Sequence, residues 1–238
     1  TTKSISLAGG DSLLYRIIAI DKANIPNYDT LPRNGYQKLH YEKLNTVAES
    51  YVTDFSDSGA DFFNIGFEIT QPSGFTSPAL HTRHPYISPE ENGDSINSVS
   101  ILRTPVIFDS TGMIIRFMEV VLVEPGEDGS VFGSEDFYDY VIVEGSKNLG
   151  NSWFPLADGY DSRYLSAWAG FYNSAIVGSN STYVGTESIM MKHTFMIDGS
   201  SLISGGDTLL VRFRLFSDPY ANGWGWVIDD LHISALIN

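Results

Sequence analysis

Apolar and polar residues alternate most regularly near the C-terminal end of the chain, over residues 206–234. Every second residue of Leu209–Leu215 is aliphatic or aromatic, and Arg212 and Arg214 lie between them. A second run, Trp226–Ile233, follows after a loop that carries glycine and aromatic residues. A period of two residues is typical of a β-strand that buries one face. The pattern therefore predicts two long strands joined by a loop.

The second of these runs contains an acid at an apolar position. Strict alternation places Asp229 on the same face as Val227, Leu231 and Ile233. A carboxylate among aliphatic side chains is costly unless it is paired, hydrogen-bonded or bound to a metal. No Lys or Arg shares that face within the strand. Two interpretations follow: Asp229 caps backbone N–H groups at a loop, or it is a calcium ligand.

Shorter stretches of the same kind predict further strands. They are Asp61–Ile69, Ser100–Phe108, Met113–Val123, Tyr138–Gly145 and Ser188–Ile197. The third is the most apolar and is expected to be a central strand. Residues 74–86, 87–98 and 124–136 are expected to be loops, and no segment has a convincing helical pattern. Strands at this spacing, separated by loops with Gly, Pro and Asn, favour an all-β sandwich.

The first part of the chain has a different character. Asp11–Lys22 and Tyr36–Leu44 predict two strands on either side of a loop that contains Pro26 and Pro32. Two strands alone are marginally stable in water. They are either the end of a preceding module or additional strands of the main domain. We expect a boundary that separates residues 1–48 from a domain at residues 49–238.

The C-terminal run also carries a family resemblance. The segments FRLFSD and NGWGWVIDDLHI resemble the closing strands of jelly-roll modules on secreted proteins of the Bacteroidota, such as the cleaved-adhesin modules of gingipains and MAM-like modules. The matching residues are Ser217, Asp218, Gly225, Trp226, Ile228, Asp229 and Asp230. The resemblance covers residues 49–238 and implies a jelly-roll sandwich, which periodicity alone does not distinguish from other sandwiches. Residues 1–48 resemble the last strands of an immunoglobulin-like or fibronectin-type module that precedes such a jelly roll.

Composition narrows the range of partners and compartments. The chain has 238 residues and a net charge of −15, which argues against binding to nucleic acid or to anionic membranes. It has no cysteine, so disulfides, thiolate zinc sites and Cys nucleophiles are excluded. No stretch has the ~18 apolar residues of a membrane span. The chain begins at Thr1 without a signal peptide, so we expect a mature or excised product. An acidic surface suits an extracellular protein, and it suits calcium. The absence of cysteine is equally compatible with a cytosolic protein and does not by itself fix the compartment.

No motif indicates catalysis. His81 and His84 lack the helical, Glu-bearing spacing of a zinc protease. The sequence has no nucleophile elbow, P-loop or dinucleotide fingerprint. Acids are plentiful, but no spacing singles out a pair suited to glycoside hydrolysis. We therefore expect a protein that is not an enzyme.

Three acids are the predicted metal ligands: Asp229, Glu119 and Asp54. Glu119 lies within the most apolar run, and its alternative role is a salt bridge across the sheet, for example to Arg116. Asp54 lies where the related modules carry an acid close to the final strand. Asp139 is a weaker candidate. Calcium takes six to eight oxygen ligands, so carboxylates from the first, a middle and the last strand would suit it.

Aromatic residues in the C-terminal half supply candidates for ligand binding. We expect Trp168, Trp224 and Tyr220 to be exposed in loops, where aromatic rings stack on sugars or contact peptides. The alternative is that these rings pack in the core or in hairpins. That second role is the one expected for Trp153 and Trp226.

Five tripeptides of Asp, Ser or Thr, and then Leu, Ile or Thr form a further pattern. Their hydroxyl residues are Ser12, Thr30, Ser95, Ser110 and Thr208. The pattern resembles the O-glycosylation acceptor of secreted Bacteroidota proteins, and Ser95 lies in the most polar loop. Thr208 and Ser12 border strands and are expected to be more enclosed. The alternative is that Asp followed by Ser or Thr makes good turns before strands.

Together these features indicate a non-catalytic, calcium-stabilised extracellular module for adhesion or recognition. It would belong to a larger secreted surface protein, of the kind exported by type IX secretion, and would bind a glycan or a protein. The alternative is an accessory domain that stabilises or targets the catalytic domain of a secreted peptidase or glycosidase.

Overall fold

The computed structural model describes residues 4–40, 42–86, 95–199 and 202–236. The chain forms two compact units, Thr1–Leu44 and Asn45–Asn238. Residues 45–48 belong with the larger unit, because the backbone N–H groups of Asn45 and Ala48 donate to the carbonyls of Arg103 and Pro105. Among the described residues, no helix is both long and apolar enough to cross a membrane.

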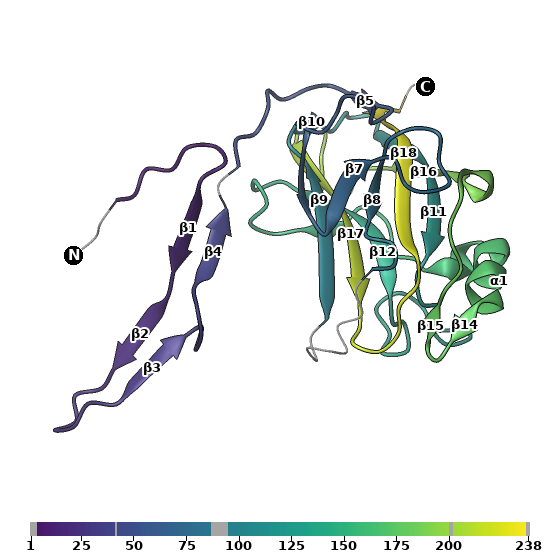
Figure 1. Ribbon diagram of the computed structural model, residues 1–238. Helices are drawn as coiled ribbons and strands as arrows, with labels where there is room; N and C mark the ends of the chain where they lie inside the picture. Colours follow the sequence, from purple (N-terminus) through teal and green to yellow (C-terminus); the bar gives the residue numbers. More distant parts are fainter. Residues whose placement is uncertain (1–3, 41, 87–94, 200–201, 237–238) are drawn as a thin grey trace. The chain divides into compact units, whose positions relative to one another are not determined.

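The larger unit is a sandwich of two antiparallel sheets (Figure 1). The first sheet contains β6 (Phe62–Ile65), β9 (Ile96–Leu102), β10 (Val106–Ile107), β12 (Tyr140–Ser146), β13 (Phe154–Pro155) and β17 (Thr208–Ser217). The second contains β5 (Tyr51–Thr53), β7 (Phe67–Thr70), β8 (Ala79–Thr82), β11 (Met113–Leu122), β16 (Met191–Ile197) and β18 (Gly225–Ala235). The strand orders are β13–β12–β17–β9–β6 and β16–β11–β18–β8–β7, with β10 beside β17 and β5 beside β18.

The order of pairing identifies the topology. Strands pair from the outside of the sequence inwards: β8 with β18, β9 with β17, β11 with β16, and β12 with β13. Successive pairs alternate between the two sheets. This nested arrangement is a jelly roll, so the expected all-β jelly-roll sandwich is confirmed.

The core lies between the two sheets and is rich in aromatic residues. The ring centroid of Phe117 in β11 lies 5.8 Å from that of Phe213 in β17 and 6.3 Å from that of Trp226 in β18. All three side chains are buried. Burial of such large apolar surfaces is the main stabilising contribution to a domain of this kind.

Strand β18 contains a bulge in its pairing with β11. Arg116 pairs with His232 and Met118 pairs with Asp229, so β18 has one more residue than β11 between these pairs. Asp230 lies in this interval with a φ of 49°, in the left-handed region. An extra residue of this kind shifts every later side chain to the opposite face.

The bulge corrects the expected position of Asp229. Asp229 shares the outer face with its partner Met118, whereas Leu231 and Ile233 are buried in the core. The prediction that Asp229 shares a face with Leu231 and Ile233 is therefore wrong, because strict alternation does not continue through the bulge.

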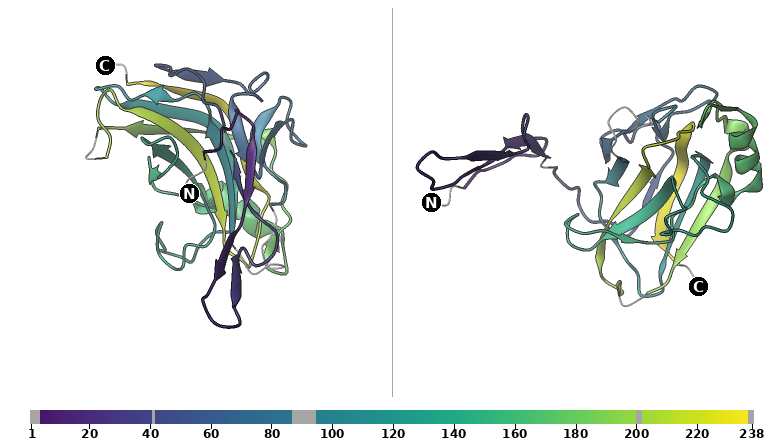
Figure 2. Two further views of the ribbon diagram at one scale, coloured as in Figure 1. Left: turned by 90° about the vertical axis from the view of Figure 1, so that its left-hand side faces the viewer. Right: turned by 90° about the horizontal axis from the view of Figure 1, so that it is seen from below.

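Two further expectations also need correction. Residues 74–86 are not only loop, because they contain β8. The chain has a helix, α1 (Ser166–Ser174), which lies beside β11 and β15 and outside the two layers (Figures 1 and 2). The short elements η2 (Ser162–Tyr164), β14 (Ile176–Val177), β15 (Asn180–Ser181) and η3 (Glu187–Ile189) flank it. Most of the loop expected at 87–98 lies outside the described residues, and β9 begins within it.

The smaller unit is a two-stranded ribbon, seen as one thin layer in Figure 2. It contains β1 (Ser12–Tyr15) paired with β4 (Gln37–His40), and β2 (Ile17–Ile20) paired with β3 (Tyr28–Leu31). Many of its large apolar side chains are exposed, including those of Leu14, Ile17, Ile18, Ile20 and Leu31. The ribbon thus has little core of its own.

Candidate functional site

The outer face of the first sheet carries a cluster of charged and aromatic side chains, here called the arginine–aromatic face: Trp153, Arg212, Glu144, Arg214 and Tyr140. Arg212 and Arg214 alternate with the core residues of β17 and so point outwards. One oxygen of Glu144, Oε2, accepts from Nε of Arg212 at 2.7 Å and from Nε of Arg214 at 2.9 Å. Burial raises the pKa of Glu144, and the hydrogen bonds from both arginines outweigh it, so the net pKa is lowered.

Aromatic rings support both guanidinium groups. The Arg212 guanidinium lies 4.3 Å from the ring centroid of Trp153, and that of Arg214 lies 5.2 Å from the ring centroid of Tyr140. Phe216 stacks on Tyr140 at 5.0 Å, and Arg214 also donates to Oδ1 of Asn97 at 3.1 Å. The face therefore presents planar groups and hydrogen-bond donors that are held in fixed positions.

A second cluster consists of the carboxylates of Glu124, Asp139 and Asp218. They follow β11, precede β12 and follow β17 respectively, and ligand atoms of all three lie within 4.8 Å of one another. Asp139 is buried and accepts a hydrogen bond from the Tyr86 hydroxyl and another, at 2.9 Å, from the backbone N–H of Asp218. Among the described residues, the buried Oε2 of Glu124 has no hydrogen-bond partner.

Burial and mutual repulsion raise the pKa values of two carboxyl groups in this acidic cluster. Burial, together with the charges of Asp218 and Glu127, raises the pKa of Glu124 to about 7. Burial also raises the pKa of Asp139 well above its ordinary value. Three close carboxylates repel one another in the ionised state, and a metal ion would remove this cost. These residues could hold a metal ion, and the unpartnered oxygen of Glu124 fits that role.

Two of the three predicted metal ligands, Asp54 and Asp229, lie near each other, and Glu119 lies apart from them. Asp54 is exposed, and its Oδ1 accepts from the backbone N–H and the hydroxyl of Ser56. Asp229 is half-buried on the outer face, and burial, with added repulsion from Asp230 and Asp54, raises its pKa to about 6. Glu119 points to the opposite, inner side of the same sheet. One ion cannot bind both Glu119 and Asp229.

Glu119 is buried and forms hydrogen bonds with core side chains. Its carboxylate accepts from Trp226 Nε1 at 2.7 Å and from the Tyr160 hydroxyl at 2.8 Å, and it lies 2.6 Å from His193 Nδ1. The alternative of a pair across the sheet is met by His193 of β16. Arg116, the example given for it, is not the partner, because it lies on the outer face and bonds to His232.

Two of the three predicted ligand-binding aromatic residues are buried. Trp168 is 1% exposed in α1, where its Nε1 donates to the carbonyl of Ile189 at 3.0 Å. Trp224 is 5% exposed, and the rings of Phe75 and His84 stack with it. The expected exposure of these two rings is wrong, because a helix and an aromatic stack enclose them. Tyr220 is 69% exposed.

The predicted glycosylation residues lie at the surface. Ser12, Ser95, Ser110 and Thr208 are exposed, and Thr30 is half-buried. Turn chemistry is also present at these tripeptides: Oδ1 of Asp109 accepts from the backbone N–H of Thr111 at 2.8 Å. Thr208 is thus more open than its position beside a strand suggested.

Part of this arrangement had a signal in the sequence. Two arginines at alternate positions of a strand must share a face, and Asp218 lies in the Ser-Asp motif that carried the family resemblance. The pairing of the arginines with Glu144 depends on the register between β12 and β17. That register is a non-local property, so sequence pattern did not predict it.

The comparisons with known proteins find similar structures but no matching sequence family. No family model and no curated protein matches the sequence. The structure is similar to the K3 cleaved adhesin domain of Lys-gingipain from Porphyromonas gingivalis W83, with a TM-score of 0.42, 14% identity and coverage of 78% of this chain and 98% of that one. It is also similar to a non-crystalline-cellulose-specific carbohydrate-binding module, CBM28, with a TM-score of 0.44, 12% identity and coverage of 82% and 97%. A third similar structure is a mannan-recognising module, TmCBM27, with a TM-score of 0.39, 10% identity and coverage of 78% of this chain and 98% of that one.

Proposed function

We propose that this chain is a non-catalytic recognition module of a larger secreted surface protein, and that it binds a glycan through the arginine–aromatic face. The observation that carries the proposal is the pair of guanidinium groups fixed between Glu144 and the rings of Trp153 and Tyr140. Aromatic faces pack against the apolar side of sugar rings, and fixed donors bind hydroxyl groups. Pre-formed groups of this kind lose little conformational freedom on binding.

Calcium stabilisation is the second part of the proposal, with Glu124, Asp139 and Asp218 as ligands. Calcium prefers carboxylate and carbonyl oxygens and tolerates irregular geometry. The ion would connect three loops at one end of the sandwich and neutralise their acids. An extracellular, cell-surface location is also part of the proposal, and the family resemblance and the acidic composition support it.

The hydrogen bonds and burial of His81 and His84 support a non-catalytic role. His81 lies 2.8 Å from the Thr70 hydroxyl and 2.7 Å from the carbonyl of Thr82, so both ring nitrogens have partners. Burial lowers the pKa of His84 to about 4, and its Nδ1 bonds to the carbonyl of Trp224. Neither ring is placed to act as a general base on an exposed substrate.

A glycan array with and without a calcium chelator tests the proposal. Trp153→Ala and Arg212→Lys should each weaken binding by about tenfold or more, because the first removes a ring and the second removes a planar, bidentate donor. Arg83→Lys is the matched control, since Arg83 is exposed beyond β8 in the other sheet. Binding that is insensitive to Trp153 and Arg212 but lost in Tyr220→Ala would assign the ligand to the Tyr220 loop and refute the proposed face.

An accessory role beside a catalytic domain is the second candidate. The exposed apolar side chains of the ribbon favour it, because a segment with so little core needs a neighbour to cover it. The test is to mix residues 45–238 and the full chain separately with the parent's other domains, and to compare binding by calorimetry. If neither residues 45–238 nor the full chain binds the other domains measurably, the accessory role is refuted.

A further inference from the structure

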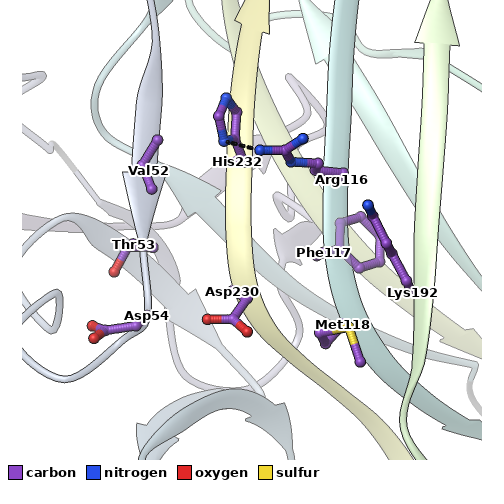
Figure 3. Close-up of a pocket in the computed structure, with 9 residues that line it drawn as sticks. All are labelled: Val52, Thr53, Asp54, Arg116, Phe117, Met118, Lys192, Asp230 and His232. Carbon is purple, nitrogen blue, oxygen red and sulfur yellow. Dashed lines mark hydrogen bonds between the residues drawn. The ribbon is translucent and has the colours of Figure 1, made fainter.

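The outer face of the second sheet has an open groove of about 690 Å³ (Figure 3). Strands β5, β11, β16 and β18 line it, so it lies on the opposite side of the sandwich from the arginine–aromatic face. Its basic and acidic side chains lie at two different ends, and apolar side chains complete the lining. Val52 and Met118 supply the apolar part.

Two cations at one end of the groove lack the ion pairs that four other cations of this unit have. Of the chain's 14 Lys and Arg residues six lie in residues 1–44, and of its 29 acids four lie there, so residues 45–238 have eight cations against 25 acids. Lys147, Arg163, Arg212 and Arg214 are each paired with a carboxylate. Within the described parts of the chain, Arg116 and Lys192 have no ion pair, and both line the groove.

A neutral histidine orients one of these cations. The Arg116 guanidinium donates from one terminal nitrogen, Nη2, to His232 Nδ1 at 2.9 Å, as Figure 3 shows. Burial, and then the charge of Arg116, lowers the pKa of His232. The ring therefore accepts a hydrogen bond without neutralising the guanidinium, which has further N–H groups for a ligand.

The other end of the groove is acidic. Figure 3 shows the carboxylate of Asp230 lying between Asp54 and Met118. Asp54 and Asp230 are exposed, and the left-handed backbone of Asp230 belongs to the bulge in β18. Asp229, beside them, interacts with both charges. The groove thus has a cationic end and an acidic end.

We propose that this groove binds an extended peptide that places an acidic side chain against Arg116 and Lys192 and a basic side chain against Asp54 and Asp230. In an extended peptide, residues two apart point to the same side and lie roughly 6.5–7 Å apart. The groove does not suit a sugar, because its described lining has no exposed aromatic ring: Phe117 is buried in the core. Charge complementarity of this kind gives specificity and fixes the position of the peptide along the groove. The site is independent of the glycan proposal.

The test is NMR titration of the full chain with a capped Gly-Glu-Gly-Lys-Gly peptide and its Gly-Lys-Gly-Glu-Gly reversal. We expect saturable shifts of the Arg116 Nε–Hε signal and the Met118 methyl signal with one of the two orders. Gln in place of Glu in the peptide should weaken binding by about tenfold, as should Arg116→Gln or Lys192→Gln in the protein. Lys147→Gln is the control, because Lys147 is paired with Asp207 on the other sheet.

Three outcomes would overturn the proposal. One is the absence of shifts at these two signals up to about 10 mM of either peptide. Another is equal binding of the Gln-containing peptide, a result that needs no protein variant and so cannot be attributed to misfolding. The third is displacement of the peptide by free galacturonate, with tighter binding of the sugar acid, which would assign the groove to an acidic glycan.

Discussion

The carboxylate of Glu119 joins three segments of the larger unit. Its partners are Trp226 in β18, His193 in β16 and Tyr160 in the connection between β13 and η2. All four side chains are buried. Buried donors that lose their acceptor keep the full cost of desolvation. Glu119, which the sequence pattern suggested as a calcium ligand, is therefore expected to stabilise the core through these hydrogen bonds.

Glu119→Ala should lower the free energy of unfolding by about 3–5 kcal/mol, because it leaves buried donors without an acceptor and a cavity beside them. Chemical denaturation measures this change. Asp54→Asn, at an exposed acid, serves as the control and should change stability by less than about 0.5 kcal/mol. A loss below about 1 kcal/mol for Glu119→Ala would show that the network contributes little.

The acidic cluster should give metal-free protein a stability that falls as pH rises. The pKa of Glu124 is raised in the folded state from an ordinary value of 4.5 to about 7. The folded protein therefore holds this proton more tightly than the unfolded chain. The resulting stability is fully present below pH 4.5 and is lost as pH rises through about 7.

Thermal melts in chelator between about pH 5 and pH 8 test this prediction. Glu124→Gln should flatten the slope relative to the unsubstituted protein, while contributions from Asp139 and Asp229 remain in both. Added calcium should raise the melting temperature most at the alkaline end and less in Glu124→Gln. Identical slopes in the two proteins would contradict the role assigned to Glu124.

At the scale of elements, alternation predicted the long strands well and failed where local geometry interrupts it. Strands β11, β17 and β18 bury one face over most of their length. The predicted strand 61–69 is divided at Gly66, whose φ is 75°. Helix α1 was missed because only Trp168 and Tyr172 are buried within its nine residues. That spacing of four is too short a signal to distinguish a helix from a loop.

The first boundary in the chain also leads to a prediction. Residues 45–238 alone should fold cooperatively, because the ribbon forms its own hydrogen bonds through β1–β4 and β2–β3. A shorter chain that begins at residue 54 should be less stable, since it lacks the pairing of β5 with β18 and the bonds of Asn45 and Ala48. Circular dichroism melts compare the two. Loss of cooperative unfolding in 45–238 would show that the ribbon is part of the sandwich.

For the whole molecule, the five Asp-Ser/Thr tripeptides predict a mass above that of the bare sequence when the protein is isolated from its native organism. Four of the five hydroxyl residues are exposed, and a bulky sugar at an exposed site disturbs no packing. Intact mass spectrometry followed by peptide mapping provides the measurement, with Ser95 as the first site to inspect. A native mass that equals the bare sequence would leave these tripeptides as turn-forming segments.

The pairing of β5 with β18 determines how the larger unit responds to a pulling force. These strands are antiparallel, with Tyr51 opposite Ile233 and Thr53 opposite Leu231, so the chain enters β5 and leaves β18 at the same end. A load applied through the flanking segments therefore breaks the hydrogen bonds between β5 and β18 one after another, and does not load them all at once in shear. Once the backbone hydrogen bonds of Asn45 and Ala48 have broken, the three-residue strand β5 yields, while β18 stays held between β11 and β8. Under tension, β5 would lengthen the chain before the jelly roll itself gives way.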